Sequence, residues 1–141
     1  MRYVLDSSVA LKWFLAEPDS GKALRLRDDA RAGVHELLAP DVFAVEITHA
    51  ITRAEPAGRI TPAEGSSFVA DLLTELPVLH PSLPLLPRAY AISSTARIGL
   101  YDCLYVALAE REGSELVTAD DRLVKNLSAR FPFLVPLGSL P

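Results

Sequence analysis

Short apolar segments alternate with helical ones along the whole chain, and this alternation restricts the possible fold more than any other feature. The apolar segments occupy residues 3–5, 37–39, 77–80, 115–118 and 133–135. Helices are expected at about residues 9–16, 22–31, 42–54, 62–75, 87–95, 102–111 and 121–129. Strands that alternate with helices pair in parallel and are covered by helices on both faces. We therefore expect an α/β fold with a doubly wound, parallel, five-stranded sheet.

Local signals support several of these helices. Residues 61–64 read Thr-Pro-Ala-Glu, which is typical of a capping box followed by a helix. Ser7 or Ser8 can cap the helix expected at residues 9–16. Residues 104–109 are apolar on every side, which predicts a buried helix rather than an amphipathic one.

Length and composition limit the class of protein. The chain has 141 residues, and we expect one domain over residues 1–141. A single cysteine excludes an internal disulfide. Asp6 and Lys12 interrupt the apolar N-terminus, so no signal peptide is expected, and no apolar run approaches the roughly 20 residues of a membrane span. We expect a soluble, cytoplasmic protein that does not enter a membrane.

The net charge of −4 argues against a generally basic nucleic-acid-binding protein. Four of the acids, however, are candidates for a common pocket, and the rest of the chain is balanced without them. A bound metal ion would also reverse the local sign of such a pocket. Overall charge therefore neither supports nor excludes a polyanionic substrate.

Four acidic residues fall where predicted strands end or helices begin: Asp6, Glu46, Asp102 and Asp120. Sites in parallel sheets lie at the carboxyl ends of the strands, so these side chains are expected to meet. Two carboxylates about 4 Å apart repel by roughly 4 kcal/mol at an effective dielectric near 20. The group must therefore raise its pKa values or bind cations. Oxygen ligands suit Mg²⁺ or Mn²⁺, which can activate water and neutralise a phosphoryl oxygen, so we predict phosphodiester hydrolysis.

Each acid also has an ordinary interpretation. Asp102 and Asp120 could be helix N-caps, Glu46 a solvated helix residue and Asp6 a turn residue. The placement of all four acids at strand and helix ends that converge favours the metal site over these separate interpretations.

Several blocks of the sequence resemble the PIN domain and, more narrowly, the VapC toxins of bacterial type II toxin–antitoxin pairs. The resemblance covers essentially the whole chain, and its blocks are Val4–Trp13, Glu46, Tyr101–Ala109 and Leu116–Asp120. It implies a metal-dependent endoribonuclease that uses Mg²⁺ or Mn²⁺, a VapB-like antitoxin partner and a homodimer.

The resemblance also implies roles for individual residues. The family's four acids, which hold the metal and carry catalysis, fall on Asp6, Glu46, Asp102 and Asp120. Its hydroxyl after the first acid falls on Ser8, and its threonine before the last acid falls on Thr118. Asp121 is an added acid at a loose position of the pattern, so its role stays open.

Other residues allow two interpretations. Arg122 and Lys125 could contact RNA phosphate or form a solvated helix face, and Arg53 and Arg97 are weaker candidates. His49 shares a helix face with Glu46 and is expected at the pocket edge rather than as a ligand.

Buried and exposed positions can be assigned in the same way. Trp13 could belong to the core or, with Phe14, be exposed to a partner. His35 and His80 are expected at the surface, and Cys103 is expected to be buried.

The main alternative is a non-catalytic PIN-type module that binds RNA or protein, and four intact acids argue against it. A phosphoacceptor receiver domain would need an acidic pair after the first strand, where the chain has Asp6 alone. A phosphatase of the Asp-x-Asp type fails because position 8 is Ser8. If the chain is a toxin, an arginine of the antitoxin should enter the acidic pocket and compete with metal.

Overall fold

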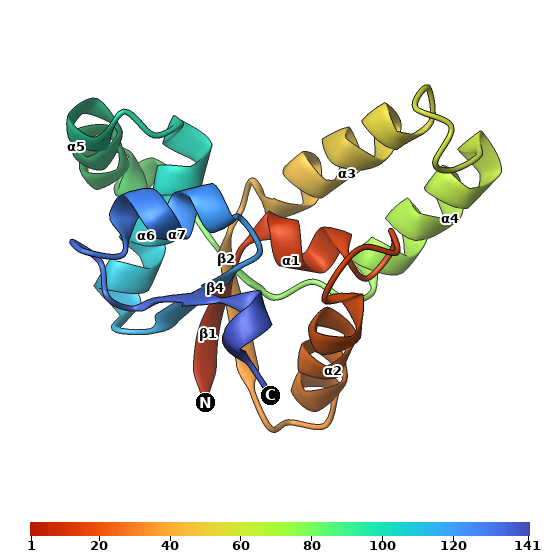
Figure 1. Ribbon diagram of the computed structural model, residues 1–141, viewed down its shortest axis with the longest axis horizontal. Coiled ribbons are helices and arrows are strands. Elements are labelled where there is room, and N and C mark those ends of the chain that lie inside the picture. The colour runs from red at the N-terminus through yellow and green to blue at the C-terminus, as the bar shows by residue number, and fades with distance from the viewer.

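Five parallel strands form the central sheet of the protein (Figure 1). The computed structural model describes all of residues 1–141. The strands are β1 (Arg2–Leu5), β2 (Glu36–Pro40), β3 (Val78–His80), β4 (Glu115–Thr118) and β5 (Leu134–Pro136). Their spatial order is β3-β2-β1-β4-β5, and every neighbouring pair is parallel. The predicted five-stranded α/β fold is confirmed.

Seven helices surround the sheet: α1 (Ser7–Leu11), α2 (Ser20–Arg31), α3 (Phe43–Ala54), α4 (Pro62–Leu73), α5 (Leu86–Ala96), α6 (Leu100–Glu112) and α7 (Asp121–Leu127). Short 3₁₀ turns, η1 (Leu83–Leu85) and η2 (Leu137–Ser139), precede α5 and follow β5. Helices α1 and α2 lie on one side of the sheet and α5 and α6 on the other (Figure 1). Helix α3 contacts α1 and α4, and the α3–α4 pair extends away from the sheet.

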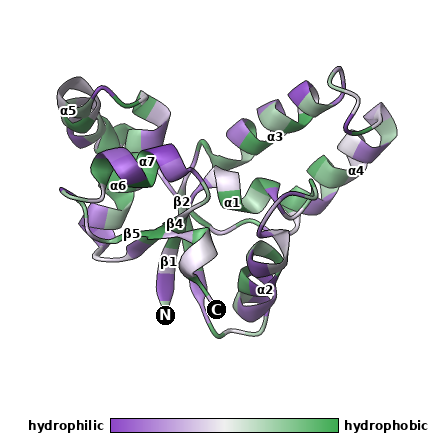
Figure 2. Ribbon diagram, in the orientation of Figure 1, coloured by the Kyte–Doolittle hydropathy of each residue, from purple (hydrophilic) through white to green (hydrophobic).

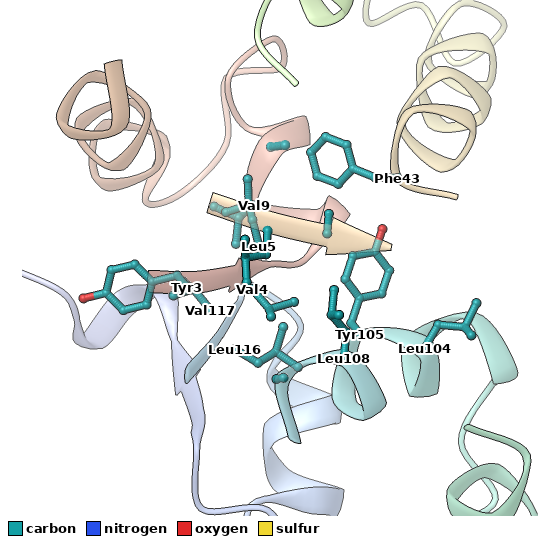
Figure 3. Close-up of a cluster of buried hydrophobic side chains, with 14 of the residues drawn as sticks. Tyr3, Val4, Leu5, Val9, Phe43, Leu104, Tyr105, Leu108, Leu116 and Val117 are labelled. Carbon is teal, nitrogen blue, oxygen red and sulfur yellow. The ribbon is translucent and has the colours of Figure 1, made fainter. Parts of the chain in front are cut away.

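The middle strands are buried on both faces. Val4 of β1 lies opposite Leu38 of β2 and Leu116 of β4, and all three side chains are fully buried. Consecutive buried apolar residues in a strand are typical of a parallel sheet with helices on both faces. Burial of one such side chain contributes about 1.5–3 kcal/mol. Figure 3 shows Val4 and Leu116 close to Leu108 of α6, and Figure 2 shows that most residues of α2 and α7 are hydrophilic.

Two helix predictions are confirmed in detail. Helix α6 buries every residue from Cys103 to Ala109 and contacts β1, β2 and β4. Helix α4 begins with the predicted capping box: Glu64 N donates to Thr61 Oγ1 over 3.1 Å, and Thr61 N donates to Glu64 Oε1 over 2.9 Å. None of the helices combines the length and apolar character that a membrane span requires.

The first helix differs from its prediction. It begins at Ser7 and ends at Leu11, and its N-cap is Asp6, which makes no side-chain capping bond. A serine cap is therefore wrong. The hydroxyl of Ser8 bonds instead to Asp6 and to the backbone of β4's following residue, Ala119, which removes it from capping.

The structure also shows how far Trp13 and the two histidines His35 and His80 are buried. Trp13 is only 9% exposed, and its Nε1 donates to the carbonyl of Ala23 over 3.0 Å, so it belongs to the core and cannot be exposed to a partner. His35 and His80 are partly exposed, and each buries one ring nitrogen. The ring of His35 packs edge-on against Tyr3.

Candidate active site

The backbone of β4 positions Asp6. Strand β1 ends at Leu5, but the next amide, Asp6 N, donates to Val117 O over 3.0 Å and so continues the pairing with β4. This register sets the Asp6 carboxylate beside Thr118, the last residue of β4. The carboxyl ends of β1, β2 and β4 point to the same side of the sheet, between α3 and α6 (Figure 1). Asp6 is only 3% exposed there.

Two hydroxyls hold one oxygen of Asp6. Ser8 Oγ donates to Asp6 Oδ2 over 2.5 Å, and Thr118 Oγ1 donates to the same oxygen over 2.8 Å. The hydroxyls are themselves fixed, because Ala119 N donates to Ser8 Oγ and Asp120 N to Thr118 Oγ1, both over 3.0 Å. No side chain donates to Asp6 Oδ1, so this oxygen is left for another ligand. Burial raises the pKa of Asp6, the two hydroxyls oppose the rise, and the charge of Asp120 adds to it.

Glu46 lies on α3, and a hydrogen bond to α6 holds its side chain at the site. Tyr105 Oη donates to Glu46 Oε1 over 2.7 Å. Burial raises the pKa of Glu46 to about 7; the charges of Asp6 and Asp102 add to the rise, while the Tyr105 bond opposes it. Figure 3 shows Tyr105 rising from α6 past the end of β2 toward the side where Phe43 begins α3.

The sequence analysis missed Tyr105. The available signal was a hydroxyl within the otherwise apolar run of α6, because a buried tyrosine hydroxyl usually finds a hydrogen-bond partner. Burial raises the pKa of Tyr105 above its ordinary value, so its hydroxyl stays protonated and acts as a donor.

Asp102 is the third residue of α6, and Gly99 is that helix's N-cap. Asp102 therefore neither begins nor caps the helix, and its N-cap interpretation is wrong. Its carboxylate accepts no hydrogen bond from the protein. Burial raises the pKa of Asp102 to about 6, the charges of Asp6 and Asp120 add to the rise, and nearby Arg122 opposes it.

Asp120 caps helix α7 and also lies near the other acids. It caps α7, since its Oδ1 accepts from Arg122 N over 3.0 Å and from Leu123 N over 3.2 Å. Its charge also raises the pKa of both Asp6 and Asp102, which places it at the same site.

A hollow of about 160 Å³ opens beside two of the acids. Its lining residues are Arg97, Ile98, Gly99, Asp102, Asp120, Arg122, Leu123 and Asn126. Of the predicted phosphate contacts, Arg122 lines this hollow, whereas Lys125 is exposed outside it. Asp121 and His49 are also exposed and are not among its lining residues. Cys103 is buried as predicted, and burial raises its pKa to about 11, which leaves no thiolate at neutral pH.

The four acids have the donor chemistry that Mg²⁺ or Mn²⁺ requires. All candidate ligand atoms are oxygens. Burial and, to a smaller extent, neighbouring acids raise the pKa values of Asp6, Glu46 and Asp102, and a bound divalent cation would favour their ionised forms. No three acidic, histidine or cysteine side chains lie close enough to share one ion as they stand. Glu46 Oε1 is bonded to Tyr105 and Asp120 Oδ1 to α7, so a shared ion requires side-chain rotation.

The PIN domain family model matches residues 3–127 of the chain. The chain belongs to the PIN domain family. Ribonuclease VapC12 of Mycobacterium tuberculosis is 39% identical over 125 residues, which cover 87% of this chain and 90% of that protein. Ribonuclease VapC3 of Pyrobaculum aerophilum is 29% identical over 137 residues, which cover 96% of this chain and 98% of that protein. This PIN domain is therefore a VapC-type chain, as its sequence blocks indicated.

Solved structures agree on the fold of this PIN domain. PAE2754 from Pyrobaculum aerophilum superposes with a TM-score of 0.68 at 22% identity, covering 99% of this chain and 94% of that one. VapBC2 from Rickettsia felis, bound to a DNA fragment from its promoter, superposes with a TM-score of 0.65 at 17% identity. The match covers 96% of this chain and 97% of that one.

Proposed function

We propose that this PIN domain is a metal-dependent endoribonuclease, the toxin of a type II toxin–antitoxin pair, that hydrolyses RNA phosphodiester bonds with Mg²⁺ or Mn²⁺. The observation that carries the proposal is the acid group of Asp6, Glu46 and Asp102, whose pKa values are all raised, first by burial and then by the charge of a neighbouring acid. Carboxylates with perturbed pKa values that are gathered in one place are typical of catalytic sites. The names of the VapC relatives, which call them ribonucleases, support the same activity.

Asp6, Asp102 and Asp120 would hold the divalent ion, which supplies charge neutralisation at a phosphoryl oxygen and a more acidic water. Ser8 and Thr118 orient Asp6 by occupying Oδ2, so that Oδ1 faces the site. Glu46 keeps Oε2 free while Oε1 accepts from Tyr105. A carboxylate with a pKa of about 7 is suited to accept a proton near neutral pH, so we assign Glu46 as the general base.

An RNA cleavage assay tests this function. Purified protein would be incubated with total cellular RNA in Mg²⁺, Mn²⁺ or EDTA, and cleavage ends would be mapped. We expect discrete internal cuts that require a divalent ion and are lost in Asp102→Asn. Asp71→Asn is the matched control, because Asp71 is exposed on α4, forms no ion pair and should leave cleavage unchanged. RNA binding without cleavage would favour the non-catalytic module, and cleavage unaffected by EDTA would contradict the metal.

We also propose that a VapB-type antitoxin inhibits the site by placing an arginine among the carboxylates. The similar solved structures include VapBC2 from Rickettsia felis and VapBC-1 from Haemophilus influenzae. Guanidinium pairs with carboxylates through two parallel hydrogen bonds, so it would compete with the metal. Antitoxin affinity should weaken as Mg²⁺ rises at fixed ionic strength, and Asp102→Asn should bind less tightly in calorimetry. An affinity that ignores both changes would place inhibition elsewhere. A homodimer remains a prediction for light scattering to check.

A further inference from the structure

Arg97 has a backbone conformation that usually calls for glycine. It ends α5 with φ 59° and ψ 39°, in the left-handed region, and its amide donates to Ser93 O over 2.8 Å. Helix α6 ends in the same conformation, but with Gly113. The other non-glycine residue with positive φ is Asp19, and aspartate tolerates this region better than most residues. A long side chain in the left-handed region costs about 1 kcal/mol. Helix termination alone would favour glycine at position 97.

Arg97 is one of the residues that line the hollow beside the acids. Arg122 lines the same hollow, together with Asp102 and Asp120. Neither guanidinium forms an ion pair or a side-chain hydrogen bond. Some arginines elsewhere on the surface do, as Arg31 does with Glu75 and Arg88 with Glu110. The hollow therefore combines two free guanidinium groups with two of the carboxylates assigned to the metal.

We propose that Arg97 and Arg122 together bind one phosphate group of the RNA backbone at this hollow, next to the scissile bond. This assignment rests on the proposed function, because it takes RNA as the substrate. Guanidinium donates two parallel N–H bonds to phosphate oxygens, and two such groups offset the negative potential of Asp102 and Asp120. Phosphate contacts of this kind position the strand without reading its sequence.

The αL conformation of Arg97 allows a test in which stability and binding change in opposite directions. In Arg97→Gly the strain is relieved, so the melting temperature should equal or exceed that of wild type. The same substitution removes a phosphate contact, so affinity for RNA should fall about tenfold. A purely structural role for Arg97 would move stability and leave RNA affinity unchanged.

Affinity would be measured by fluorescence anisotropy with an RNA oligonucleotide in EDTA, where the proposed metal-dependent cleavage does not proceed, at several salt concentrations. Loss of one phosphate contact should lower the slope of log affinity against log salt by about 1. Arg25→Ala is the matched control: Arg25 is exposed on α2, forms no ion pair, and its loss changes net charge equally. Arg97→Lys should lose part of the affinity, because lysine keeps the charge without the planar fork.

Loss of affinity in Arg97→Gly, with wild-type stability and an unchanged Arg25→Ala, supports the phosphate site. Equal affinity of Arg97→Gly and wild type, equal losses in the two variants, or no RNA binding by wild type overturns it. The assay needs no catalysis, so wild type that binds RNA without cutting it would remove the proposed function and leave the Arg97 assignment standing.

Discussion

Replacing Asp102 with asparagine should stabilise the metal-free protein while abolishing RNA cleavage. The Asp102 carboxylate accepts no hydrogen bond, so the amide loses no protein partner. Its pKa is about 6, against an ordinary 3.8, because of burial and the charges of Asp6 and Asp120. The ionised form is therefore destabilising in the folded protein, and asparagine removes that charge.

The magnitude follows from the pKa. A difference of about 2 units corresponds to about 3 kcal/mol, since each unit is about 1.4 kcal/mol. Asp102 is only partly buried, so solvent screening reduces the expected gain to about 1 kcal/mol. For a chain of this length that gain raises the melting temperature by about 3 °C.

The gain should depend on pH with a definite sign. The unfolded carboxyl ionises near its ordinary pKa and the folded one near 6, so the penalty develops between these values and is complete above them. Calorimetry in EDTA should show the full gain of Asp102→Asn at pH 8 and almost none at pH 4. Asp71→Asn should change the melting temperature little at either pH. A lower melting temperature for Asp102→Asn at pH 8, or the same gain at both pH values, would refute the electrostatic reasoning.

Three further changes have distinct expected outcomes. Tyr105→Phe removes the donor that lowers the pKa of Glu46, so the pH of half-maximal cleavage should move upward in a pH–rate profile; an unmoved profile would argue against Glu46 as the base. Thr118→Val leaves buried Asp6 with one hydroxyl donor fewer and should destabilise the fold by about 1–2 kcal/mol in urea unfolding; unchanged stability would contradict this role of Thr118. Thr61→Ala breaks the α4 capping box and should cost about 1 kcal/mol while RNA cleavage stays unchanged.

The parts of the site that follow from chain order could be predicted. Asp6 directly follows a strand of apolar residues, so its place at the carboxyl end of the sheet depends only on the α/β pattern. Thr118 and Asp120 follow from β4 in the same way. The buried helix α6 was visible in residues 104–109, because a helix that is apolar on every side must be covered on every side.

The parts that depend on side-chain contacts between distant elements could not be predicted. The Tyr105–Glu46 bond joins α6 to α3, and nothing in either segment alone specifies the other. Ser8 looked like a helix cap because serine often caps helices, but the tertiary contact with Asp6 and Ala119 takes its hydroxyl. The left-handed conformation of Arg97 gave no sequence signal, since arginine rarely adopts it.

Anomalous diffraction from crystals soaked in Mn²⁺ tests the central claim most directly, because it locates the metal independently of activity. We predict a manganese peak in contact with the carboxylates of Asp6 and Asp102, and loss of that peak in Asp6→Asn crystals soaked in the same way. The contradicting result would come from a protein that cleaves RNA in Mn²⁺ solution. If its soaked crystals show no manganese peak at these carboxylates, or a peak only elsewhere, a carboxylate-held metal is not the centre of catalysis.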